Sequence, residues 1–158
     1  ENNMFGYKPI KTTLIVGFVC VFIFSACESP AESVPESGEI SGTITFIGDP
    51  PTDGSVMISL STNWPPREAP YAFLPVTLSG SSFNYEFNEV AFGTYGAISI
   101  SWEDPNDPSP ATKDHVLGAY GGSVQSGFMD ATSVTLTEDE HKLENADFTA
   151  DFKLAGPS

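Results

Sequence analysis

The segment "SFNYEFNEVAFGTYGAISISW", residues 82–102, gives the clearest indication of the fold. Its first half alternates aromatic with polar side chains, and its second half alternates isoleucine with serine. A period of two residues is typical of a β-strand that is buried on one face and exposed on the other. The glycines of "AFGTYG" favour a turn between the two halves. The stretch therefore predicts two neighbouring strands, with inward-facing side chains at Phe83, Tyr85, Phe87, Ile98 and Ile100.

The same alternation recurs throughout residues 38–153, where helical periodicity is almost absent. Turn sequences such as "GDPPTDG" and "DPNDPSP" separate the alternating runs. Because short strands with one apolar face must pack as two face-to-face sheets, we expect an all-β domain over residues 38–153. It should be a single antiparallel two-sheet β-sandwich of about seven or eight strands. One helical turn is expected around residues 138–143, and strands are expected at 38–47, 55–61, 72–79, 82–90, 94–102, 115–121, 132–137 and 145–152.

Four motifs of this domain resemble a known fold family. They are "ISGTITF", "VMISLS", "FNYEFNEVAFGTYGAISIS" and the closing "LENADFTADF". Together they resemble the transthyretin-like, carboxypeptidase-regulatory-like (prealbumin-like) sandwich. The resemblance covers roughly residues 38–153 and implies a fold rather than an activity; a fibronectin-type sandwich fits nearly as well. For Tyr95 we expect either a hydroxyl bonded to nearby backbone, as in a tyrosine corner, or an ordinary half-buried strand residue.

A short apolar run, residues 14–24, follows Lys8 and Lys11 near the start of the sequence. It is shorter than the roughly 20 residues of a bilayer-spanning helix, and the pattern is typical of a secretory signal. The following "FSAC" resembles the bacterial lipobox, although Phe24 replaces the usual Leu. The resemblance implies a signal peptide over residues 1–26 and lipidation of Cys27. The alternatives are an ordinary secretory signal and a retained membrane anchor.

Residues 27–37 should connect the lipid to the domain. The sequence "ESPAESVPES" has no apolar periodicity, so we expect a disordered tether, and residues 154–158 should form a C-terminal tail. Two or more acyl chains hold a protein firmly on a membrane. The lipoprotein resemblance implies a bacterial cell-envelope location. Glu28, where Asp would favour inner-membrane retention, favours the outer membrane.

Composition excludes several classes of function. Residues 27–158 carry a net charge of about −16, which argues against binding nucleic acid or anionic lipid surfaces. Cys20 and Cys27 are the only cysteines, so the domain has no disulfide. Neither His115 nor His141 lies in a catalytic or zinc-binding motif, and no "GxSxG" is present. We therefore expect no enzyme and no cofactor, with calcium as the one candidate ion.

Two loops carry the candidate binding residues. The segment "TNWPPREAPY", residues 62–71, could present Trp64, Arg67 and Tyr71 as an exposed platform for sugar rings or a protein partner; alternatively, Trp64 covers the open end of the core. The expected function is a non-enzymatic, lipid-anchored binding or structural module with a protein or polysaccharide partner; the alternative is a carbohydrate-binding accessory lipoprotein. The second loop offers hard oxygen ligands of the kind that calcium prefers, or else a solvated acidic loop: Glu103, Asp104, Asn106, Asp107 and Asp114.

Overall fold

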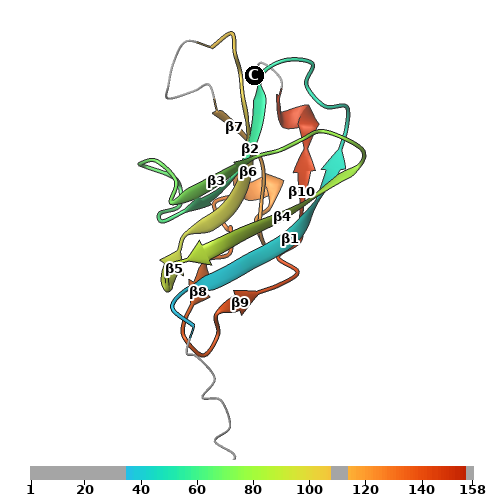
Figure 1. The fold of residues 1–158 in the computed structure, drawn as a ribbon. Coiled ribbons are helices and arrows are strands. Elements are labelled where there is room, and N and C mark those ends of the chain that lie inside the picture. The colour runs from blue at the N-terminus through green and yellow to red at the C-terminus, as the bar shows by residue number, and fades with distance from the viewer. Residues whose placement is uncertain (1–34, 108–113, 156–158) are drawn as a thin grey trace, which may run out of the picture. The chain divides into compact units, whose positions relative to one another are not determined.

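The computed structural model describes residues 35–107 and 114–155 (Figure 1). The chain divides into two units, Glu1–Glu32 and Ser33–Ser158. The expected signal peptide, Cys27 and most of the expected tether lie outside the described residues. The described elements are β1 (Gly38–Ile47), β2 (Ser55–Ser61), β3 (Ala72–Pro75), β4 (Ser82–Val90), β5 (Gly93–Tyr95), β6 (Ala97–Glu103), β7 (Asp114–Ala119), η1 (Val124–Ser126), β8 (Val134–Leu136), β9 (Lys142–Leu143), β10 (Phe148–Asp151) and η2 (Phe152–Ala155).

The strands form several open sheets, which confirms the all-β prediction. One sheet has the order β10-β1-β4, with β9 also paired to β1, and the other has the order β3-β2-β6-β7. β5 and β8 form a separate two-stranded ladder. Figure 1 shows β4, β1 and β9 side by side. Both larger sheets contribute to one hydrophobic core, whose fully buried side chains include Ile40, Ile44, Ile58, Leu60, Ile98, Ile100 and Leu117.

The expectation of a purely antiparallel arrangement is wrong for the end of the domain. Both β9 and β10 run parallel to β1, while β4 runs antiparallel to it. Between β9 and β10 the chain stays beside β1, because the Ala146 N–H donates to the Ser41 carbonyl and the Thr43 N–H donates to Asp147 Oδ1. Alternation of side chains is the same in parallel and antiparallel strands, so it carries no information about direction.

The described chain also forms more strands than the expected seven or eight, because several expected runs are divided or shortened. The run 94–102 is interrupted at Gly96 between β5 and β6, and the run 72–79 is a strand only up to Pro75. The helical turn expected around 138–143 is wrong, since residues 142–143 form β9. Apart from η1 and η2, each a single 3₁₀ turn, the described ranges contain no helix.

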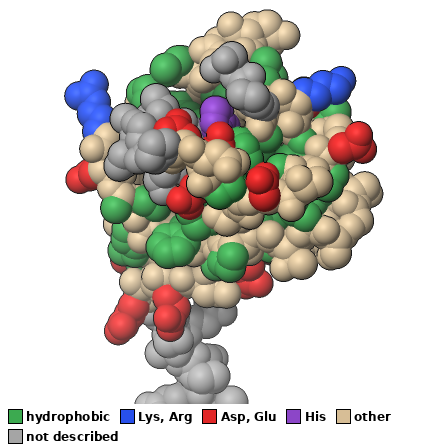
Figure 2. Space-filling view, turned by 90° about the horizontal axis from the view of Figure 1, so that it is seen from above, with side chains coloured by type: hydrophobic (Ala, Val, Ile, Leu, Met, Phe, Trp, Pro, Cys, Tyr) green, Lys and Arg blue, Asp and Glu red, His purple; other side chains and the backbone are tan. Residues whose placement is uncertain are grey.

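Acidic side chains occupy turns and the outward positions of strands. Figure 2 shows Asp and Glu scattered over one face, with Lys and Arg only near its margins. The Lys142 ammonium pairs with the Glu39 carboxylate at 2.7 Å, and this pairing raises the pKa of Lys142.

Within the described ranges, no helix has the length and hydropathy to cross a membrane.

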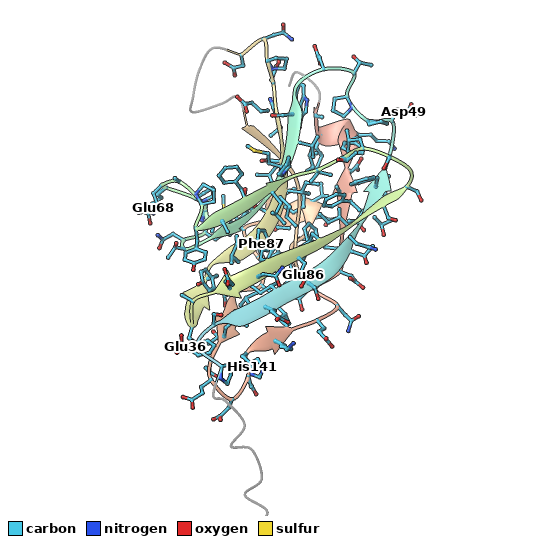
Figure 3. The ribbon with its side chains drawn as sticks, viewed as in Figure 1. Glu36, Asp49, Glu68, Glu86, Phe87 and His141 are labelled. Carbon is cyan, nitrogen blue, oxygen red and sulfur yellow. The ribbon has the colours of Figure 1, made fainter. Side chains whose placement is uncertain are left out.

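The predicted inward-facing residues are confirmed, but not their position on neighbouring strands. Tyr85 and Phe87 are buried, as are Ile98 and Ile100, and Phe83 is half-buried against the core. However, β4 and β6 belong to different sheets, so these side chains contact the core from opposite sides. Figure 3 shows Phe87 directed into the domain and Glu86, its neighbour on β4, on the outer face.

The turn between β4 and β6 contains the expected tyrosine corner. The Tyr95 hydroxyl donates to the Ala91 carbonyl at 2.7 Å, and the Ala91 N–H donates to the Tyr71 hydroxyl at 3.0 Å. The two tyrosine rings meet edge to face with centroids 5.0 Å apart. Burial, together with a hydrogen bond to Tyr71, raises the pKa of Tyr95 to about 12. This arrangement holds the turn in which the chain passes from the sheet of β4 to the sheet of β6.

Gly118 brings the two sheets together at one edge. A Cβ at this position would collide with the Thr149 carbonyl oxygen, so only glycine permits this approach of β7 to β10. On the other side, β3 and β4 are the outermost strands of their sheets.

Candidate functional site

The outer face of the second sheet has a floor of serines. The core-facing residues of β2 and β6 are apolar, so Ser59 and Ser61 on β2, and Ser99 and Ser101 on β6, point to the opposite face. Ser59 and Ser99 are directly opposite each other in the register. Small hydroxymethyl side chains fill little space, and they leave this part of the sheet hollow.

The segment between β2 and β3 folds over this floor and makes it a groove of about 560 Å³. Ligand-binding pockets commonly have volumes of about 300–1,000 Å³. The Asn63 side-chain amide donates to Glu68 Oε1 at 2.8 Å, which closes the segment on itself. In Figure 3, Glu68 lies on this loop beside β3. The groove is lined by Ser59, Ser61, Trp64, Pro66, Arg67, Glu68, Pro70, Ser99, Ser101 and Val116.

Trp64 is held in place by a second loop. Its indole Nε1–H donates to the Phe128 carbonyl at 2.6 Å, and the side chain is half-buried. Phe128 itself is buried and has a left-handed backbone conformation, with φ of 64°. The indole therefore connects the loop after η1 with the wall of the groove, and its ring position is fixed.

A carboxylate organises this second loop. Asp130 accepts hydrogen bonds from the Ser123 N–H (2.8 Å), the Ser123 hydroxyl (2.7 Å) and the Ser126 hydroxyl. These donors, with the Ser126 hydroxyl contributing most, lower the pKa of Asp130 to about 2. Asp130 therefore stays ionised across the physiological range and keeps residues 123–130 in the shape that presents the Phe128 carbonyl to Trp64.

The groove includes two of the three predicted aromatic-loop residues. Trp64 and Arg67 line it, whereas Tyr71 does not, because its ring packs on Tyr95 and its hydroxyl bonds to Ala91. Trp64 is half-buried and lines the groove together with the outward-facing serines of the second sheet. The alternative in which Trp64 covers the open end of the core stays a prediction. Sequence reasoning missed the serines, although the repeated S-x-S pattern at 59–61 and 99–101 carries that signal.

The acidic loop is only partly described. The Asp104 carboxylate accepts from the Asn106 N–H at 2.8 Å, which is a local turn contact, and Glu103 accepts from the Ser55 hydroxyl at 3.4 Å. The register of β6 and β7 places Glu103 opposite Asp114, but the side chain of Asp114 lies outside the described part. Residues 35–107 and 114–155 contain no group of three or more His, Cys, Asp or Glu side chains placed to hold a metal. Calcium binding by this loop, which includes Asp107, stays a prediction.

Both histidines occupy structural positions. The His115 ring lies 5.4 Å from the Trp102 ring, and His141 Nδ1 lies 3.2 Å from the Glu138 carbonyl oxygen. Neither histidine lines the serine-floored groove.

Comparison with protein-family models, with curated proteins and with solved structures found no match. The geometry of the groove and the sequence are thus the basis for a function.

Proposed function

We propose that this chain is a lipid-anchored, non-enzymatic binding module of the bacterial cell envelope, with the outer membrane as the favoured location. The observation that carries the proposal is the sequence "FSAC", which follows the apolar run and ends at Cys27. A short polar segment separates Cys27 from Gly38, where β1 begins. A diacylated cysteine at this position would hold the domain stably on a membrane. The groove over the second sheet supports a binding role for the part that is held there.

We also propose that the domain is a two-sheet sandwich of the transthyretin-like kind. The strand order supports this over an immunoglobulin-type arrangement. In immunoglobulin constant domains the first two strands share one sheet. In this chain β1 pairs with β4 and β10, whereas β2 pairs with β3 and β6.

The positions of the histidines support a non-enzymatic role. A general base needs to lie within hydrogen-bond reach of a reacting group in a pocket. His115 packs on Trp102, and His141 lies in a turn beside Glu138.

The second candidate function is a carbohydrate-binding accessory lipoprotein. The specific observation in its favour is that Trp64 and Arg67 line the same groove, since an aromatic face and a guanidinium are groups that contact sugars. The two candidates share the anchor and differ in the partner.

The experiment that tests the anchor compares Cys27→Ser with Cys20→Ser in a bacterial host fed a radiolabelled fatty acid. Unmodified chain and Cys20→Ser should incorporate label and partition into detergent, whereas Cys27→Ser should do neither. Mass spectrometry of the purified protein should give a diacylated Cys27 as the first residue. Label retained in Cys27→Ser, or an unmodified amino terminus at another residue, would refute the proposal.

A further inference from the structure

We propose that the groove over β2 and β6 binds a neutral oligosaccharide, with the serine floor contacting sugar hydroxyls and Trp64 contacting the apolar face of a ring. This inference gives a ligand class to the binding module proposed above. It rests on the proposed function only for the location of the domain at the cell envelope, because the groove is formed entirely by the domain and does not involve Cys27.

The serine hydroxyls are available for a ligand. None of the four has a hydrogen bond to another residue within the described ranges, and no buried side-chain oxygen or nitrogen there lacks a partner. Their oxygens must therefore reach solvent inside the groove, even though Ser61 and Ser99 are 4% and 7% exposed as whole residues. A hydroxyl can both donate and accept, so it matches a sugar hydroxyl in either orientation.

The sheet fixes the spacing of these hydroxyls. Adjacent strands lie about 4.8 Å apart, and alternate residues of one strand about 6.7 Å apart. Ser59 and Ser99 are paired across the two strands, whereas Ser61 lies opposite Ala97 and Ser101 lies opposite Met57. The four hydroxyls therefore form a staggered polar grid that runs diagonally across β2 and β6. A rigid grid costs little conformational entropy on binding, because β-strand serines have few rotamers to lose.

Aromatic side chains flank the grid. Trp64 is fixed through its indole N–H, so its ring is already ordered before a ligand arrives. Phe73 on β3 lies directly opposite Ser59 in the register and is 59% exposed, which places a second ring beside the floor. Pyranose rings present C–H groups on one face, and aromatic rings are a favourable surface for them.

Charge selects a neutral glycan over an acidic one. The full chain has a net charge of −15, and among the residues that the structure describes Arg67 is the only cationic one that lines the groove. Glu68 lies next to it in the same lining and offsets that charge. A polyanion would meet a repulsive field, whereas a neutral sugar would gain hydrogen bonds from both groups.

The test titrates the purified full chain with maltohexaose, cellohexaose, xylohexaose and mannohexaose, each up to about 10 mM, in the range of weak binding. Acrylamide quenching of tryptophan fluorescence reports the groove, because Trp64 lines it whereas Trp102, the other tryptophan, is 5% exposed. At least one hexasaccharide should lower the quenching constant and release heat in calorimetry. Polygalacturonate should not.

Two variants connect binding to the groove. Ser59→Val/Ser101→Val removes two floor hydroxyls while keeping good strand formers, and we expect an affinity loss of about tenfold or more. Phe73→Thr changes an exposed side chain, so the fold should be retained while affinity falls. The matched control is Thr45→Val/Ser82→Val, a cross-strand pair on the other sheet, which should bind as the unmodified chain does.

Three results would overturn the inference. They are no response to any of the four neutral hexasaccharides, unchanged affinity in the floor double variant, and tighter binding of polygalacturonate. Running the same titration on Cys27→Ser separates this inference from the anchor. Sugar binding without lipidation would support the groove alone, and lipidation without sugar binding would support the anchor alone.

Discussion

The hydroxyls of Tyr85 and Tyr95 make the same hydrogen bond in different surroundings, and their removal should have different costs. The Tyr85 hydroxyl donates to the Ala146 carbonyl at 2.7 Å, and Ala146 is fully buried. Tyr85→Phe leaves that carbonyl without this donor in the protein interior, which costs about 1–3 kcal/mol of unfolding free energy. In Tyr95→Phe, the acceptor belongs to Ala91, which is exposed, so water can replace the hydroxyl and the cost should be about 1 kcal/mol or less.

The assay is urea denaturation at neutral pH, followed by far-ultraviolet circular dichroism. With a slope of about 1–3 kcal/mol per molar urea, the midpoint of Tyr85→Phe should fall by roughly 1 M, and that of Tyr95→Phe by clearly less. Each change removes one oxygen and keeps the ring, so packing volume is matched. Equal losses, or a larger loss in Tyr95→Phe, would mean that burial of the acceptor does not decide the cost.

Three further predictions concern pH, packing and calcium. Burial raises the pKa of Tyr95 from 10.0 to about 12, so between these pH values the folded state keeps a proton that the unfolded state releases. The free energy of unfolding should therefore fall as the pH rises from about 10 towards 12, and it should fall less steeply in Tyr95→Phe. A denaturation midpoint that does not change over this range would contradict the prediction. Gly118→Ala should cost about 1–3 kcal/mol or more in denaturation, because its Cβ meets the Thr149 carbonyl; a loss as small as that of Gly122→Ala, whose nearest contact would be 3.3 Å, would count against it. If the acidic loop binds calcium, calcium at about 100 times its dissociation constant should add about 2.7 kcal/mol to the free energy of unfolding. The gain should disappear in Asp104→Asn/Asp107→Asn. An equal gain from magnesium would indicate general charge screening instead.

The sequence predicted which residues face inwards because burial follows the strand period. Tyr85, Phe87, Ile98 and Ile100 were identified from alternation alone, and all are buried. The same reasoning could not assign β4 and β6 to different sheets, because the pattern of a strand is independent of its neighbours. That assignment depends on the crossing at Tyr95, which is a tertiary feature.

The parallel pairing of β9 and β10 with β1 could not be predicted from the sequence either. It depends on contacts separated by about a hundred residues, such as Thr43 with Asp147. Asn145 has a left-handed backbone conformation, with φ of 57°, and lies between β9 and β10; alternation does not signal it. Local patterns specify faces, and long-range hydrogen bonds specify partners.

The groove was predicted only in part. Trp64 and Arg67 stood out because the loop of residues 62–71 combines aromatic residues with prolines, and because cationic residues are scarce in this acidic protein. Outward serines such as Ser59 and Ser99 resemble ordinary solvated strand positions, and only the covering loop makes them the floor of a groove. The loop position depends on the contact from Trp64 to Phe128, 64 residues away in the sequence.

The pairing of β1 on both edges has a mechanical consequence. The proposed tether is joined to the first residue of this strand, so a pull on the anchor would be applied to the end of β1. β4 on one edge and β9 with β10 on the other would then resist by shear, with their ladder hydrogen bonds sharing the force instead of opening one after another. Forced unfolding is governed by the rate of leaving the native state, and a strand held on both sides leaves slowly. A domain tethered in this way would keep its groove intact while its ligand, attached to another body, pulled against the membrane.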